Sequence, residues 1–154
     1  MNSDLIELLQ FLNEYKVRYL VIGGQAVIVH SEPRYTKDLD IWVEASKQNS
    51  KKLVEALEDF GAPTNALKAD DFVRPGTLFI FGIEPNRVDI LNAPKGTTFK
   101  SAYTNKKVIT YEGVKVPFIG LAELIKLKRA AGRKQDKMDL EKLERSKRIE
   151  KKKK

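Results

Sequence analysis

The chain contains no cysteine, and it has only one histidine, one tryptophan and two methionines among its 154 residues. The lack of cysteine excludes disulfides, zinc sites built on thiolates and thiol nucleophiles. No apolar run reaches the roughly 20 residues that a membrane-spanning helix needs, and residues 1–4 lack the basic segment of a signal peptide. These absences predict a cytoplasmic protein that does not act in a membrane.

The net charge of +8 is confined to one end of the chain. Residues 1–122 carry 15 basic and 15 acidic side chains, whereas residues 123–154 carry 14 basic and 6 acidic ones. The length and a hydrophobic content of 42% are those of one globular domain. We predict this domain over residues 1–143 and a frayed, basic helical tail over residues 144–154. Such a tail is either a solvated helix or an arm that binds nucleic acid or phosphate.

Apolar periodicity and turn residues predict helices and strands in a mixed order. Helices are expected over residues 4–15, 24–31, 46–60, 121–131 and 136–149, and strands over residues 19–22, 39–43, 77–82, 87–91, 107–111 and 114–117. The last four strands form two hairpins, and residues 62–76 form an irregular connection. Ser3 or Asp4 is expected to cap the first helix, and Asp136 the last one. This mixture predicts an α/β (α+β) fold, in which helices flank a mixed β-sheet and two helices end the chain.

A glycine pair and two aspartates form the most specific pattern in the chain. Gly23 and Gly24 follow an apolar strand, where backbone N–H groups in a turn can bind phosphate. Asp38 and Asp40 lie on the next strand and point to the same face, because side chains alternate along a strand. Two carboxylates held side by side repel each other unless a cation lies between them. The pattern therefore predicts a site for a metal and a nucleotide.

A third acid, Asp89, lies between Val88 and Ile90 in a later predicted strand. If this strand pairs with residues 39–43, the three acids meet at one edge of the sheet. Three carboxylates can hold two Mg²⁺ ions about 3.5–4 Å apart, with Mn²⁺ as an alternative. One ion would activate an attacking hydroxyl, and the other would neutralise a leaving pyrophosphate.

These elements resemble the nucleotidyltransferase superfamily, to which DNA polymerase β and the small minimal nucleotidyltransferases belong. Ile22–Gly24, Asp38–Ile41 and Val88–Ile90 match the three parts of the superfamily pattern in the required order. Arg34–Asp40 is similar to the Arg-x-Thr-x-Asp-apolar-Asp motif of toxin–antitoxin and abortive-infection members. Leu127–Leu140 resembles their C-terminal helices, whose pattern is Lys-x-x-Ala-x-Arg-x-x-Asp-x-x-Asp-Leu.

The resemblance implies a role for each matching residue. Asp38, Asp40 and Asp89 would be the catalytic and metal-binding residues, with Asp38 and Asp40 holding both ions and Asp89 helping to activate the acceptor. The residues expected to bind the nucleotide are Gly23, Gly24, Arg34, Thr36, Lys128 and Arg133. Many members have serine at the position of Gly24, so the contact with phosphate would rest here on backbone N–H groups alone. Arg34 could instead form a salt bridge with Glu32 or Asp38, and Lys128 and Arg133 could be surface charges.

The implied reaction transfers a nucleoside monophosphate from an NTP to a hydroxyl and releases pyrophosphate. The acceptor would be a protein or an RNA, and a cognate toxin or antitoxin is a candidate partner. Two other functions stay open. The first is a catalytically inactive module of the same fold that binds a nucleotide or a partner. The second is an RNA-binding protein that acts through its basic C-terminus, whose affinity would fall steeply with salt.

Overall fold

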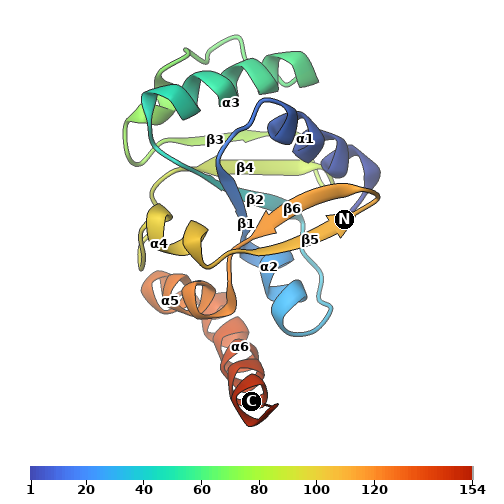
Figure 1. Cartoon of the computed structure of the whole chain (residues 1–154), viewed down its shortest axis with the longest axis vertical. Helices are drawn as coiled ribbons and strands as arrows, with labels where there is room; N and C mark the ends of the chain where they lie inside the picture. The colour runs from blue at the N-terminus through green and yellow to red at the C-terminus, as the bar shows by residue number, and fades with distance from the viewer. Residues whose placement is uncertain (154) are drawn as a thin grey trace.

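The computed structural model describes residues 1–153 and shows a six-stranded sheet between layers of helices (Figure 1). The strands are β1 (Tyr19–Ile22), β2 (Asp38–Val43), β3 (Leu78–Phe81), β4 (Arg87–Leu91), β5 (Lys107–Tyr111) and β6 (Val114–Phe118). The helices are α1 (Ser3–Glu14), α2 (Gly23–His30), α3 (Lys47–Phe60), the short 3₁₀ helix η1 (Asp71–Val73), α4 (Phe99–Thr104), α5 (Leu121–Ala131) and α6 (Lys134–Lys153). Lys154, the last residue of the predicted tail, lies outside the described residues.

The sheet is mixed and has the strand order β3-β4-β2-β1-β6-β5. The central strand β2 pairs antiparallel with β1 and parallel with β4, while β1 pairs parallel with β6. Strands β3 and β4 form one antiparallel hairpin, and β5 and β6 form the other. The predicted α/β fold with a mixed sheet and two hairpins is therefore confirmed.

The two faces of the sheet have different covers (Figure 1). Helices α1 and α3 lie on one side of the sheet, and α2, α4 and α5 lie on the other. Leu39, Ile41 and Val43 of β2 are fully buried on the side of α1 and α3. Asp38, Asp40 and Trp42 alternate with them and face the opposite side, where the ring of Trp42 packs edge-on against Phe99 of α4 at 5.5 Å. The acids thus lie on the face whose helical cover is incomplete.

Two helix caps differ from the sequence prediction. Helix α1 is capped by Asn2, whose side chain accepts a hydrogen bond from the backbone N–H of Leu5 at 3.1 Å, and not by Ser3 or Asp4. Asp136 is also not a cap, because α6 begins two residues before it, at Lys134. It accepts from the backbone N–H of Arg133 at 3.1 Å, which is the reciprocal half of a capping box.

Helix α4 is absent from the predicted elements, and its six residues are too few for an apolar periodicity. Helix α6 runs without a break from Lys134 to Lys153, and Leu143 is its last buried residue. The division between residues 143 and 144 stays a prediction, and we propose that the domain ends where α6 leaves the core. Within residues 1–153, no helix combines the length and the apolar character that crossing a membrane requires.

The buried Asn49 of α3 connects the ends of β1 and β2. Its side chain accepts from the backbone N–H of Arg18 at 2.7 Å and donates to the carbonyls of Arg18 and Glu44, both at 3.0 Å. We expect Asn49→Ala to lower the free energy of unfolding by about 2–4 kcal/mol, because buried backbone groups lose their partners. Urea denaturation measures this loss. Asn105→Ala is the control, since the exposed side chain of Asn105 makes one hydrogen bond, to the carbonyl of Ser101. Equal losses in the two variants would contradict the expectation.

Candidate active site

Three carboxylates meet on the open face of the sheet. In the parallel register of β2 and β4, Asp40 lies opposite Asp89 and Asp38 lies opposite Arg87. Each acid offers one oxygen atom that lies within 4.8 Å of the oxygens offered by the other two. The pairing of the two strands therefore brings the three predicted acids together. They meet on a face between two interior strands, however, and not at the edge of the sheet.

The three carboxylates repel one another. Burial, together with the charges of Asp38 and Asp89, raises the pKa of Asp40 from 3.8 to about 7. Burial and the charge of Asp89 also raise the pKa of Asp38. The neighbouring cations compensate this repulsion only in part. Such a cluster of hard oxygen ligands fits a divalent cation such as Mg²⁺, which would remove the repulsion.

Arg87 is a residue of this site that the sequence analysis missed. Its guanidinium donates to both oxygens of Asp89, with Nε to Oδ1 at 2.9 Å and Nη2 to Oδ2 at 3.1 Å. The side chain is partly exposed, at 34%. Strand alternation is the signal that could have found it, because residues 87 and 89 of one strand point to the same face. Arg87 therefore holds the Asp89 carboxylate in one orientation.

The turn between β1 and α2 lies against the acids. Gly23 has a φ of +66°, in the left-handed region that favours glycine. A Cβ atom on Gly23 would overlap the carboxylate of Asp40. Because no side chain fits between them, the backbone of the turn can approach the acids closely. The N-terminus of α2 thereby faces the same space as the carboxylates, as a phosphate-binding turn would require.

A cavity of about 630 Å³ lies above the acids, a size that suits a small ligand. Of the residues predicted for the site, Gly23, Asp38, Asp40, Asp89, Lys128 and Arg133 line this cavity. Lys37, Arg87 and Lys95 also line it and add positive charge around the acids. Carboxylates at the base and cations on the walls are a suitable arrangement for a metal-bound polyphosphate.

Lys128 and Arg133 bring positive charge from the C-terminal helices. The Lys128 side chain is 8% exposed, and its ammonium contacts Asp136 at 3.2 Å and Asp139 at 3.1 Å. It is therefore not a surface charge. Arg133, whose side chain is 78% exposed, pairs with Asp136 at 2.7 Å. Burial raises the pKa of Asp136, but the hydrogen bonds from Arg133 and Lys128 outweigh this effect and lower it overall.

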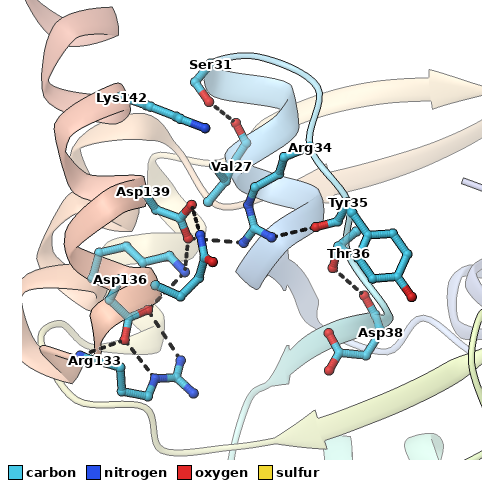
Figure 2. Close-up of polar contacts among 12 residues, drawn as sticks. Val27, Ser31, Arg34, Tyr35, Thr36, Asp38, Arg133, Asp136, Asp139 and Lys142 are labelled. Carbon is cyan, nitrogen blue, oxygen red and sulfur yellow. Dashed lines mark hydrogen bonds and ion pairs between the residues drawn. The ribbon is translucent and has the colours of Figure 1, made fainter.

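Gly24, Arg34 and Thr36 lie together behind the cavity wall and do not line it. A Cβ atom on Gly24 would lie 2.5 Å from Thr36 Oγ1 and 3.2 Å from Arg34 Nη2. Arg34 forms its salt bridge with Asp139 at 3.1 Å, and neither Glu32 nor Asp38 is its partner (Figure 2). Thr36 Oγ1 donates to the carbonyl of Asp38 at 3.2 Å. The nucleotide contacts of these three residues stay a prediction.

A mixed sheet with an acidic triad beside a glycine turn defines the nucleotidyltransferase class. The model of the family "Nucleotidyltransferase of unknown function (DUF6036)" matches residues 3–153, and the chain belongs to this family. It is therefore a nucleotidyltransferase, as the resemblance predicted. No curated protein matches the sequence.

Solved structures of nucleotidyltransferases share the fold. The lincosamide antibiotic adenylyltransferase LnuA, bound to lincomycin, is 19% identical with a TM-score of 0.56, over 94% of this chain and 96% of its own. ANT(2″)-Ia in complex with adenylyl-2″-tobramycin is 15% identical with a TM-score of 0.59, over 96% and 90%. A nucleotidyltransferase-like protein from Paracoccidioides brasiliensis is 15% identical with a TM-score of 0.56, over 90% and 72%. At these identities the likeness shows the fold alone.

The close contact at Gly23 gives a test of the turn. We expect Gly23→Ala to lower the free energy of unfolding by more than the ~1 kcal/mol of backbone strain alone, because its methyl group displaces Asp40. Gly61→Ala is a matched control: Gly61 has a φ of +95°, but no atom lies within 4 Å of its Cβ position. Thermal unfolding of both variants measures the difference. Equal losses would show that the turn tolerates a side chain beside Asp40.

The raised pKa of Asp40 makes stability depend on pH. Because the pKa is about 7 in the folded state and 3.8 ordinarily, folding favours the protonated acid. This stability is present below pH 4 and is lost as the pH rises to about 7. We expect Asp40→Asn, measured in EDTA, to exceed the wild type in stability at pH 8, by at most about 4 kcal/mol, and to match it near pH 4.

Thermal unfolding between pH 4 and pH 8 measures this effect. Asp59→Asn, at an exposed position of α3, is the control and should leave the pH dependence of the wild type unchanged. Mg²⁺ added at pH 8 should stabilise the wild type and not Asp40→Asn. A parallel pH dependence of the wild type and Asp40→Asn would contradict the repulsion described above.

Proposed function

We propose that the protein transfers a nucleoside monophosphate from an NTP to a hydroxyl on a protein or RNA acceptor. One observation carries this proposal: Asp38, Asp40 and Asp89 converge in a cavity that the Gly23 turn also lines. The three acids supply ligands for metal, and the turn supplies backbone N–H groups for phosphate. The cations on the cavity wall supply charge for the same polyphosphate.

The donor set supports two Mg²⁺ ions, with Mn²⁺ as the alternative. All three ligands are carboxylates, which are the side chains that Mg²⁺ prefers, and the cations of the chain compensate their mutual repulsion only in part. Asp38 and Asp40 would hold both ions, and Asp89 would complete the site on the acceptor side. When bound, the ions polarise the α-phosphate and neutralise charge on the leaving pyrophosphate.

The residues of the chain then position the reacting groups. The Gly23 turn binds the triphosphate, and Lys128 and Arg133 neutralise its outer phosphates. The acceptor oxygen bonds to the α-phosphorus, and the bond from that phosphorus to the β-phosphate oxygen breaks. Pyrophosphate leaves with the electron pair of the broken bond. Asp89, fixed by Arg87, takes the proton of the hydroxyl and passes it to solvent.

Exposed apolar side chains at the rim of the cavity support the proposal of a protein acceptor. Leu78 and Ile80 of the edge strand β3 are 59% and 45% exposed, and Ile80 lies opposite Asp89 in the sheet register. Exposed apolar side chains beside a catalytic site favour contact with a protein surface. The resemblance of residues 34–40 to toxin–antitoxin nucleotidyltransferases supports a macromolecular acceptor, and a cognate toxin or antitoxin is a candidate partner. LnuA and ANT(2″)-Ia carry antibiotic ligands, which makes such small molecules the alternative acceptors to test.

Transfer of a radiolabelled nucleotide tests the proposal directly. Each of the four NTPs, labelled at the α-phosphate, is incubated with the protein, Mg²⁺ and either cell extract, tRNA, lincomycin or tobramycin. We expect the wild type to label a protein or RNA band, and the double variant Asp38→Ala, Asp40→Ala to lose at least about a hundredfold in rate, because the metal ligands are gone.

Glu44→Ala is the matched control, since Glu44 is a carboxylate at the end of β2 that pairs with Arg18 away from the cavity. It should keep the wild-type rate. Label on lincomycin or tobramycin alone would replace the macromolecular acceptor by a small one. Binding of NTP with Mg²⁺ but no transfer in any mixture would contradict the proposal and favour a nucleotide-binding module.

A further inference from the structure

Asp139 is a fully buried carboxylate with charged partners on two other segments of the chain. Its Oδ2 atom contacts Arg34 Nη2 at 3.1 Å and Lys128 Nζ at 3.1 Å, and its Oδ1 atom accepts from Gln135 at 3.0 Å. Arg34 belongs to the segment between α2 and β2 (Figure 2). Lys128 belongs to α5. One side chain of α6 therefore connects three parts of the fold.

The contact with Arg34 leads to the glycine turn. The Nη2 atom of Arg34 that binds Asp139 lies 3.2 Å from the position of a Cβ on Gly24. Its Nη1 atom donates to the carbonyl of Tyr35 at 2.8 Å, which orients the guanidinium across the turn. Figure 2 shows this guanidinium between Asp139 and the segment of Tyr35 and Thr36 that runs into Asp38. The charge of Asp139 thus fixes a cation against the backbone of Gly24.

The contact with Lys128 leads to the cavity. Lys128 lines the cavity, and its ammonium lies between Asp136 and Asp139. Asp136 has a second cation, Arg133, whereas Asp139 has Arg34. Without Asp139, Lys128 would keep only a partner that it shares with the exposed Arg133. The direction in which Lys128 presents its charge to the cavity therefore depends on Asp139.

We propose that Asp139 is a positioning residue for the triphosphate site. Its carboxylate fixes the conformation of the glycine turn through Arg34. It also fixes the direction in which Lys128 presents its charge to the cavity. The role of Asp139 in nucleotide binding rests on the proposed function, whereas its coupling to the glycine turn does not. A buried carboxylate and its cations hold one another in place, because none of them can leave the others without a large penalty. Without the charge of Asp139, both Arg34 and Lys128 are therefore released. Asp139 then acts on the nucleotide without itself lining the cavity.

Asp139→Asn tests this role, because it removes the charge and keeps the shape of the side chain. We expect the dissociation constant of NTP with Mg²⁺, measured by calorimetry with each of the four NTPs, to rise about tenfold. In the protein without nucleotide, we expect the amide resonances of Gly23 and Gly24 to shift in ¹H–¹⁵N spectra. A merely structural role would lower the melting temperature and leave these two resonances and the dissociation constant at their wild-type values, which would overturn the proposal.

Lys142→Ala is the matched control. Lys142 also lies on α6 and contacts the same segment, through Glu32 at 3.1 Å, but this pair is exposed to solvent. Its loss should move neither the glycine resonances nor the dissociation constant; shifts as large as those of Asp139→Asn would overturn the proposal. If Asp139→Asn does not fold, Arg34→Gln breaks the same contact and leaves Lys128 and Asp139 paired. This variant is read by the glycine resonances alone, because Arg34 is itself a predicted nucleotide contact; unchanged resonances would overturn the proposal. A wild type that binds no NTP refutes the proposed function, and the glycine resonances still decide the role of Asp139.

Discussion

The parallel pairing of β2 with β4 is the constraint on which the site depends. It places Asp40 opposite Asp89 and fixes three like charges within 4.8 Å of one another. The buried residues that alternate with the acids, among them Leu39 and Ile41, hold the strands in this register, since a slip by one residue would turn the acids into the core. The hydrophobic core thus supplies the energy that keeps the repelling carboxylates together. The cations around the site can be understood from the charge of these carboxylates.

The cations of the site divide into two kinds. Arg34 and Lys128 are largely buried, and each has an acidic partner from α6. Arg87 and Arg133 are more exposed and lie at the mouth of the cavity. The buried pair is held in place and shapes the walls, because a buried cation cannot leave its counter-charge without a large penalty. Arg133, whose side chain is 78% exposed, can exchange its carboxylate for a phosphate at little cost, since water screens the intermediate arrangement. Arg87 stays on Asp89 through two hydrogen bonds.

Strands and hairpins that local sequence patterns encode could be predicted. Features of the fold that depend on contacts between distant residues could not. The strands of Asp38, Asp40 and Asp89, and both hairpins, follow from alternation and turn residues, and the order of the motifs indicated that the acids meet. Helix α4 was missed because its six residues are held by a tertiary contact, the packing of Phe99 on Trp42. The partner of Arg34 could not be read locally, since Asp139 lies 105 positions further along the chain.

The two groups of carboxylates illustrate how an acid that binds a ligand differs from one that supports the fold. Asp40 is buried beside other acids, and its charge opposes folding until a cation arrives. Asp139 is buried between two cations, and its carboxylate pairs with both of them. Sequence alone does not separate them, because both lie in Asp-containing motifs and are followed by an aliphatic residue, Ile41 or Leu140. The surroundings do: an acid whose charge the chain leaves uncompensated is a site for something outside the chain, and an acid whose charge is matched on every side belongs to the fold. By this criterion Asp40 belongs to the nucleotide site, and Asp139 belongs to the part of the fold that supports the site.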